Sequence, residues 1–372
     1  MLQPAVIVPG GDWREVMFGC ERWLGPLRPE TAVQALRGAA DALSDEERVD
    51  RYGEGPIVGE FEHQVAELLG KQAALLFPSG TMAQTIALRI HCDARSTSSV
   101  AFHPTCHLEL FEQAGYAHLH ALKATLVGHR DALITLSDLE ALTPPLGAVL
   151  LELPQREIGG QLPDWDDLRA QVEAIRERGG AVHLDGARLW QTAPFYGRSF
   201  AEICAPFDTV YVSLYKDLAG LAGAVLAGPA GVIDQARVWR RRHGGTLPRL
   251  FPLVAAARPG FAELLPQMEA FCAHARAVAA AFAEIEGVDV VPDPPQTPMF
   301  HLHLRGDGEA IFDRALAVAR EQRIWILPAL SPTAVPGVSR AEITIGEPAL
   351  AISPAEAAEL LEQIVGGPPA GG

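Results

Sequence analysis

The sequence predicts an α/β protein with a mainly parallel β-sheet, followed by a smaller α/β domain of antiparallel character. From about residue 73 to residue 228, short apolar runs alternate with helical patterns, which is typical of crossover units with helices on both faces of a sheet. Near the C-terminal end, two apolar runs follow one another without a helix between them. The chain has 372 residues, a length that suggests about two domains.

Composition narrows the class of protein. Hydrophobic residues make up 48% of the chain and charged residues 20%, as in ordinary folded proteins. A formal charge of −16 argues against a general nucleic-acid or anionic-membrane partner. The five cysteines are scattered and odd in number, so neither a disulfide framework nor a metal site is expected. No membrane-length apolar run and no leader pattern is present, and we expect a cytoplasmic protein.

Four segments make up the predicted domain organisation. Residues 1–28 are rich in Pro and Gly and are expected to be extended, without a regular element. Residues 29–248 form a large domain that carries the ligand site, and residues 249–366 form a bridging helix and a small C-terminal α/β domain. The Gly- and Pro-rich residues 367–372 are expected to be a disordered tail.

The elements of the large domain follow from periodicity and from start and stop signals. Pro29 stands at a tolerated first helical position, Gly70 ends a helix, and Ser137 and Glu140 have capping-box spacing. The expected helices span residues 29–43, 57–69, 82–90, 107–113, 164–178 and 232–242, with a helical stretch over 250–285. The expected strands span residues 73–77, 99–102, 117–122, 148–153, 181–184, 208–214 and 223–228.

The small domain is predicted from the same signals. Its expected strands span residues 288–291, 299–304, 324–327 and 341–345, and its expected helices span residues 308–321 and 354–365.

Two neighbouring strands end in residues that suit one cofactor. Asp185 follows the strand at residues 181–184, and Lys216 follows the apolar run at residues 208–214. In an open parallel sheet, ligands bind outside the carboxyl ends of the strands. Pyridoxal phosphate needs a lysine for a Schiff base and an acid that keeps its pyridine nitrogen protonated. Taken singly, each residue also fits an ordinary loop or turn.

A third strand end supports this interpretation. After the strand at residues 73–77, Ser79, Gly80 and Thr81 lead into a helix. The N–H groups and the dipole of a helix start attract anions such as a phosphate group, although Ser and Thr there also serve as simple caps. A cluster of arginines further along the chain is either an anion site or a solvated helix face; it comprises Arg237, Arg240, Arg241, Arg242 and Arg249.

Four motifs resemble those of the L-threonine aldolases, which belong to the β-eliminating lyase group of fold-type-I pyridoxal phosphate enzymes. They are Asp50–Glu54, Phe77–Met82, His107 followed by Phe111–Glu112, and His183–Trp190. The resemblance runs from about residue 50 to residue 245, and more loosely to about residue 346. It implies a transferase-like large domain with a seven-stranded sheet, and a lyase that cleaves a β-hydroxy-α-amino acid to glycine and an aldehyde.

The resemblance also implies roles for single residues. Lys216 would form the Schiff base and Asp185 would pair with the pyridine nitrogen. The segment Ser79–Thr81 would hold the phosphate, Arg188 would lie near the phenolic oxygen, and His107 would stack on the ring. A lone histidine is more often structural, so the role of His107 depends on the resemblance.

In this family the active site is shared across a dimer, which implies a homodimer or homotetramer. Tyr52, Arg241 and Arg249 would then serve a neighbouring subunit. Arg340 resembles the arginine that grips the substrate carboxylate, for which a bidentate donor is well suited.

The departures from the family lie around the substrate. At Glu152–Arg156, the family's Glu-Asn-Thr-His-Asn is replaced and Gln155 stands where the histidine that approaches the β-hydroxyl would be. His107, His103 or a bound water could act as the base instead. Three hypotheses therefore stand: an aldolase; a pyridoxal phosphate enzyme for β-elimination, racemisation or transamination; and a non-catalytic scaffold.

Overall fold

The computed structural model describes residues 13–366, which form two compact units. The first unit comprises residues 33–157 and 162–265, and the second comprises residues 13–32, 158–161 and 266–366. The division thus falls after residue 265, whereas the sequence suggested a boundary after residue 248. The predicted disordered tail at residues 367–372 and the first part of the predicted extended segment lie outside the described residues.

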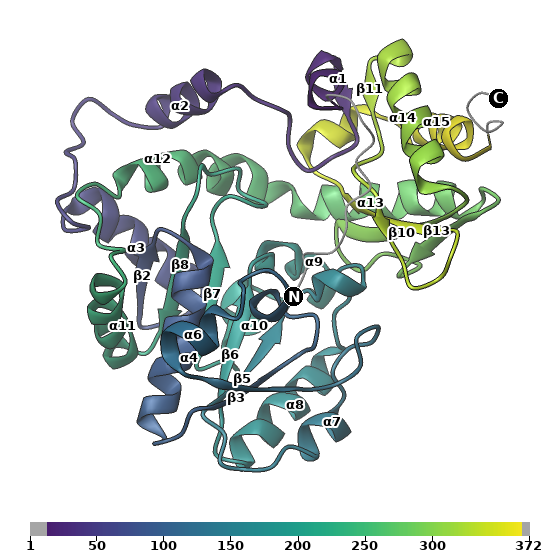
Figure 1. Cartoon of the computed structure of the whole chain (residues 1–372). Coiled ribbons are helices and arrows are strands. Elements are labelled where there is room, and N and C mark those ends of the chain that lie inside the picture. The colour runs from purple at the N-terminus through teal and green to yellow at the C-terminus, as the bar shows by residue number, and fades with distance from the viewer. Residues whose placement is uncertain (1–12, 367–372) are drawn as a thin grey trace. The chain divides into compact units, whose positions relative to one another are not determined.

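The first unit is built on the predicted seven-stranded, mainly parallel sheet (Figure 1). Its strand order is β2-β8-β7-β6-β5-β3-β4. β8 runs antiparallel to both of its neighbours, and the other adjacent strands are parallel. The strands are β2 (Ala73–Phe77), β3 (Ser99–Phe102), β4 (Lys123–Leu126), β5 (Ala148–Glu152), β6 (Ala181–Gly186), β7 (Thr209–Ser213) and β8 (Ala224–Gly228).

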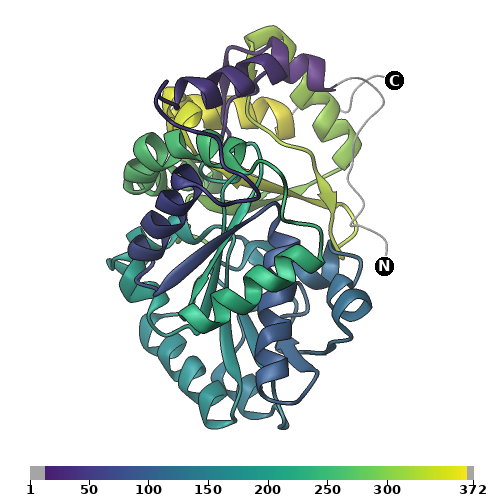
Figure 2. The same cartoon turned by 90° about the vertical axis from the view of Figure 1, so that its left-hand side faces the viewer.

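Helices lie on both faces of this sheet (Figure 2). α4 and α11 pack against each other and against the sheet, and they bury apolar side chains such as Leu75, Ile86 and Leu226. The helices of this unit are α2 (Ala32–Asp41), α3 (Pro56–Leu68), α4 (Gly80–Ala94), α5 (His107–Leu110), α6 (Gly115–His120), α7 (Leu136–Glu140), α8 (Trp165–Glu177), α9 (Ala193–Tyr196), α10 (Phe200–Cys204), α11 (Ala230–Arg242) and α12 (Phe251–Pro259).

The strand predicted at residues 117–122 is wrong, because this stretch belongs to helix α6 and the next strand begins at Lys123. Tyr116 and His120 are buried one helical turn apart, whereas Leu119 is 63% exposed. The burial of this short run therefore follows a helical period. Its apolar content alone led to the prediction of a strand. β4 itself is a largely exposed edge strand, so its sequence has no apolar run from which it could be predicted.

The capping box of α7 is displaced from its predicted position. Thr135 is the N-cap residue and receives a 3.3 Å hydrogen bond from the Asp138 backbone N–H. Asp138 in turn accepts a 2.8 Å bond from the Thr135 backbone N–H. The N-cap residue therefore lies two residues before the predicted Ser137 cap, and Asp138 takes the N3 role that a glutamate usually has.

The second unit has the predicted antiparallel character. Its four-stranded sheet has the order β12-β13-β10-β9, with every pair antiparallel. The strands are β9 (Val288–Val291), β10 (Met299–Arg305), β12 (Ser331–Pro332) and β13 (Val338–Thr344), and the helices are α13 (Met268–Ala283), α14 (Gly308–Gln322) and α15 (Pro354–Gly366).

The N-terminal part of this unit is more regular than predicted. Residues 13–28 contain helix α1 (Trp13–Gly19) and strand β1 (Arg22–Trp23), so the expectation of a segment without regular structure is wrong there. β1 pairs in parallel with β11 (Ile324–Trp325), and the Trp13 and Trp325 rings stack with centroids 6.1 Å apart. The regular structure of this segment depends on contacts with residues some 300 positions later in the chain. Local composition therefore could not predict it.

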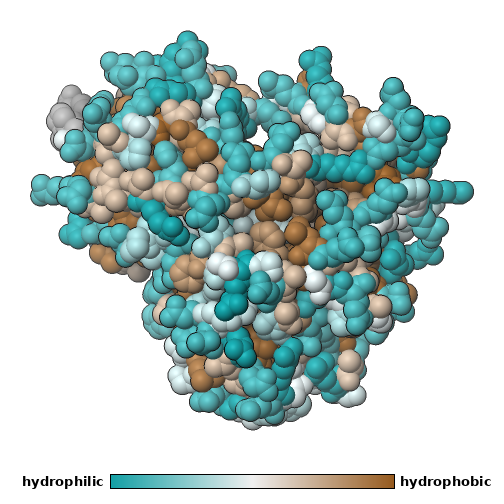
Figure 3. Space-filling view, turned by 180° about the vertical axis from the view of Figure 1, so that it is seen from behind, coloured by the Kyte–Doolittle hydropathy of each residue, from teal (hydrophilic) through white to brown (hydrophobic). Residues whose placement is uncertain are grey.

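Hydrophilic residues cover most of the face seen in Figure 3, and hydrophobic residues occur there in smaller groups. Within residues 13–366, no helix has the length and apolar character needed to cross a membrane.

Candidate functional site

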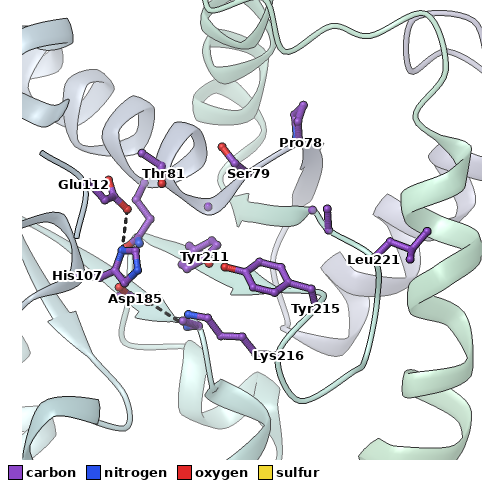
Figure 4. A pocket seen from close by; sticks show the side chains of 15 residues that line it. Pro78, Ser79, Thr81, His107, Glu112, Asp185, Tyr211, Tyr215, Lys216 and Leu221 are labelled. Carbon is purple, nitrogen blue, oxygen red and sulfur yellow. Dashed lines mark hydrogen bonds and ion pairs between the residues drawn. The ribbon is translucent and has the colours of Figure 1, made fainter. Parts of the chain in front are cut away.

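A cavity of about 250 Å³ lies in the first unit, and six of the predicted site residues line it (Figure 4). β6 and β7 are adjacent parallel strands, and they bring Asp185 and Lys216 to the same edge of the sheet. The start of α4 supplies a third wall. The predicted residues that line the cavity are Ser79, Gly80, Thr81, His107, Asp185 and Lys216.

Asp185 is buried, and its Oδ1 accepts a 3.0 Å hydrogen bond from the Ala187 backbone N–H. Glu152 stands opposite it in the register of β5 and β6. Burial, with the nearby Asp185 charge, raises the pKa of Glu152 to about 8. Glu152 is therefore mostly protonated at neutral pH.

Lys216 occupies a setting that favours its neutral amine. Burial lowers its pKa below the ordinary range, and the Arg188 guanidinium lowers it further, while Asp185 and Glu152 oppose the shift. A lysine amine becomes a nucleophile only when it is deprotonated. The following residue, Asp217, accepts a 2.7 Å hydrogen bond from Gln191, which anchors the loop after Lys216.

The start of α4 lies at one end of the cavity, and this end suits an anion. Ser79 is the N-cap residue, and its Oγ accepts a 3.3 Å hydrogen bond from the Met82 backbone N–H. A Cβ at Gly80 would lie 2.2 Å from the Tyr211 hydroxyl oxygen, so glycine is required there. The backbone N–H groups of the first helical turn have no partner within the helix and attract negative charge.

His107 begins α5 and turns its ring to the cavity (Figure 4). Its Nδ1 is 3.0 Å from Oε1 of Glu112. Two buried oxygens of lining residues, Oε2 of Glu112 and Oε1 of Gln84, have no hydrogen-bond partner among the described residues. Such groups are costly to leave unsatisfied, and both belong to residues that line the cavity.

Sequence reasoning missed the two tyrosines of this cavity, Tyr211 and Tyr215. Tyr211 lies within β7, and Tyr215 follows two residues after the end of that strand. Their nearness to Lys216 in the sequence was the signal available for finding them.

The remaining predicted residues do not line the cavity. Tyr52 is 45% exposed and has a φ of 58°, and the Arg249 guanidinium donates to the Pro248 carbonyl oxygen at 2.9 Å. Arg241 is exposed on α11. Arg340 belongs to the second unit, where it lies opposite His303 in the register of β10 and β13.

One member of the arginine cluster has a structural role. Arg240 is 2% exposed, and its Nη1 donates a 2.6 Å hydrogen bond to the Leu76 carbonyl oxygen near the end of β2. Arg237, Arg241 and Arg242 are exposed, as expected for a solvated helix face.

Gln155 and His103 form a buried network instead of facing the cavity. Nε2 of Gln155 donates to Oε2 of Glu152 at 3.1 Å and to Oγ1 of Thr105 at 3.2 Å. Nδ1 of His103 is 2.7 Å from the same threonine oxygen. Of the two histidines considered as bases, only His107 lines the cavity.

This set of groups fits pyridoxal phosphate. One cavity combines a lysine amine of lowered pKa, a buried carboxylate and a helix start with two hydroxyls. A carbonyl, a pyridine nitrogen and a phosphate group are the chemical partners of those three features.

Comparisons with known proteins agree with this fit. Residues 30–305 match the family model described as β-eliminating lyase. Low-specificity L-threonine aldolase 1 of Arabidopsis thaliana is 27% identical over 296 residues, which are 77% of this chain and 82% of that protein. An aldolase of Penicillium aethiopicum, named vrtJ, is 33% identical over 73% of this chain and 70% of that protein.

A solved structure extends the match to nearly the whole chain. The crystal structure from Exiguobacterium sp. 255-15, named as a putative aromatic amino acid β-eliminating lyase/threonine aldolase, is 37% identical. It aligns with a TM-score of 0.90 and covers 96% of this chain and 99% of that chain. The chain therefore belongs to the β-eliminating lyase family and has the fold of the fold-type-I pyridoxal phosphate enzymes.

Proposed function

We propose that this protein is a pyridoxal phosphate-dependent lyase that cleaves the Cα–Cβ bond of a β-hydroxy-α-amino acid, giving glycine and an aldehyde. The observation that carries the proposal is the delivery of Asp185 and Lys216 by adjacent strands to a cavity closed by the start of α4. The names of the Arabidopsis and Penicillium relatives, a threonine aldolase and an aldolase, support this reaction over others.

Different residues would hold different parts of the cofactor. Lys216 would bind its carbonyl carbon, Asp185 would keep its pyridine nitrogen protonated, and His107 would cover its ring. Ser79–Thr81 would hold the phosphate, and Arg188 and Arg241 would support the cofactor from outside the cavity. When bound, pyridoxal phosphate supplies an electron sink for the bond that breaks.

His107 is our candidate for the group that takes the proton from the substrate hydroxyl. Its Nδ1 is engaged by Glu112, which leaves Nε2 as the ring atom able to accept a proton from a ligand. Gln155, in the place of the family histidine, has its amide N–H groups committed to Glu152 and Thr105.

We also propose a homo-oligomer that completes the site. Tyr52, Arg241 and Arg249 lie outside the cavity of their own chain at exposed positions, where they can serve a neighbouring subunit. Arg340 would bind the substrate carboxylate. All five cysteines are free and buried, which is compatible with a reducing cytoplasm.

A second candidate function keeps the cofactor residues and changes the reaction to β-elimination, racemisation or transamination. The position of Gln155 favours it, because the usual hydroxyl-binding histidine is replaced by a side chain that does not face the cavity. A scaffold without activity is disfavoured by the pairing of Asp185 and Lys216 in one cavity.

Product analysis tests the proposal. The protein loaded with pyridoxal phosphate is incubated with threonine, allo-threonine and phenylserine, and glycine, aldehyde, keto acid and ammonia are measured separately. We expect equal amounts of glycine and aldehyde. Keto acid without glycine would favour elimination, when ammonia accompanies it, or transamination, when it does not. Inversion at Cα of the recovered amino acid would favour racemisation, and no change in any amino acid would favour the scaffold.

A further inference from the structure

Tyr215 stands between the end of β7 and Lys216, and its side chain lines the cavity. Its ring centroid is 5.9 Å from Nζ of Lys216. The hydroxyl is turned toward Tyr211 and the interior of the cavity (Figure 4). The phenol therefore faces the same space as the lysine.

The Tyr215 hydroxyl lacks a protein partner. The hydroxyl of Tyr116 donates to Glu109 at 2.7 Å, and that of Tyr196 donates to the Pro163 carbonyl oxygen at 3.0 Å. Among residues 13–366, no group forms a hydrogen bond with the Tyr215 hydroxyl. Tyr215 is 41% exposed, so its hydroxyl is free to donate to a ligand that enters the cavity.

Among the described residues of one chain, backbone and hydroxyl donors line the end of the cavity at α4. Lys216 is the one lysine or arginine among the described lining residues, and the proposed function uses it for covalent attachment. Besides any arginine that a neighbouring subunit supplies, a phosphate group at the helix start would be held by backbone N–H groups and by hydroxyl donors. The hydroxyls of Ser79, Thr81 and Tyr211 are such donors, and that of Tyr215 is a further one within the same cavity.

We propose that the Tyr215 hydroxyl donates a hydrogen bond to the phosphate group of the cofactor. This inference rests on the proposed function, because it requires pyridoxal phosphate in the cavity. Hydrogen bonds to charged groups are stronger than those between neutral groups, and removing this one should weaken cofactor affinity about tenfold. The aromatic ring, which is retained in Tyr215→Phe, contributes to cofactor binding independently of the phosphate.

The experiment compares two cofactor forms on the apo protein. Cofactor is removed with a carbonyl reagent, and the protein is titrated with pyridoxal phosphate and with pyridoxal, which has no phosphate, while tryptophan fluorescence is recorded. For Tyr215→Phe we expect about tenfold weaker binding of pyridoxal phosphate and a change within about twofold for pyridoxal. Tyr196→Phe is the matched control, because its hydroxyl is bonded to a backbone carbonyl away from the cavity, and both affinities should equal those of the wild type.

Each other outcome overturns the inference. Equal losses for the two forms would place the effect on the ring or on the cavity as a whole, and an unchanged affinity for pyridoxal phosphate would show that the hydroxyl does not bind it. A wild-type protein that binds no pyridoxal phosphate would overturn the proposed function together with this inference. Loss of the Tyr215 assignment alone leaves the proposed function standing.

Discussion

At the scale of single residues, the candidate site depends on controlled protonation. Burial lowers the pKa of Lys216, and burial with the neighbouring Asp185 raises that of Glu152 to about 8. The result is an amine that can react beside a carboxyl group that is mostly protonated at neutral pH. Three predictions follow from these residues.

The first concerns covalent attachment of the cofactor. Protein purified with pyridoxal phosphate should be yellow, and Lys216→Ala should lose the colour because no other lysine lines the cavity. Borohydride reduction and peptide mapping should mark Lys216. A label on Lys71, whose ammonium donates to two backbone carbonyls, or on the exposed Lys123 would refute the assignment.

Asp185→Asn should fold normally but lose activity by a factor of about 10² or more, because an amide cannot hold a pyridine nitrogen protonated. Circular dichroism checks the fold and steady-state kinetics the loss. Asp217→Asn, in the anchored loop beside the lysine, is the comparison variant and should lose less. Turnover close to that of the wild type in Asp185→Asn would rule out this role.

Glu152 should make stability depend on pH. Its pKa is raised from 4.5 to about 8 on folding, so between these values the folded state binds more protons than the unfolded state. The contribution to stability is therefore present at low pH and is lost as the pH rises from about 4.5 through 8. Glu152→Gln should flatten the fall in Tm over this window. A variant with the same pH slope as the wild type would assign the slope to other groups.

At the scale of elements, the loop after β7 carries backbone strain. Ala219 has a φ of 57°, a left-handed conformation that costs a residue with a Cβ about 1 kcal/mol. A glycine at this position would adopt the same conformation without steric cost. Gly220 is required for another reason, since a Cβ on it would lie 2.6 Å from the Leu214 carbonyl oxygen.

Ala219→Gly should therefore raise the free energy of unfolding by up to about 0.6 kcal/mol, after allowance for the greater freedom of glycine in the unfolded chain. Gly220→Ala is the matched variant and should lower it by about 1–3 kcal/mol through overpacking. Urea denaturation measures both. A loss of stability in Ala219→Gly would mean that the left-handed turn is not strained.

At the scale of the whole molecule, we predict from the exposed helix α2 that the protein assembles with further copies of itself. It has ten residues, and its apolar side chains Val33 and Leu36 are 55% and 63% exposed. A helix this short is marginal in water unless a packed face stabilises it. Covering this face with a second copy would bury apolar surface, and closed symmetry is the common result.

Light scattering should thus give a mass of at least twice 39.8 kDa. Leu36→Asp should shift the distribution toward single chains and weaken activity if neighbouring subunits share residues. A monomer that is fully active at nanomolar concentration would contradict both the assembly and the proposed roles of Tyr52, Arg241 and Arg249.

The sequence by itself determined the mainly parallel sheet and the positions of Asp185 and Lys216 at strand ends, because periodicity and strand termination are local properties. It also placed the turn with Ser79 at the start of α4. Only the tertiary structure decided that residues 117–120 are helical and that β1 pairs with β11. It likewise decided that Gln155 turns into a buried network while Tyr215 faces the cavity. These outcomes depend on contacts between segments far apart in the chain, and local patterns do not contain the free energy of such contacts.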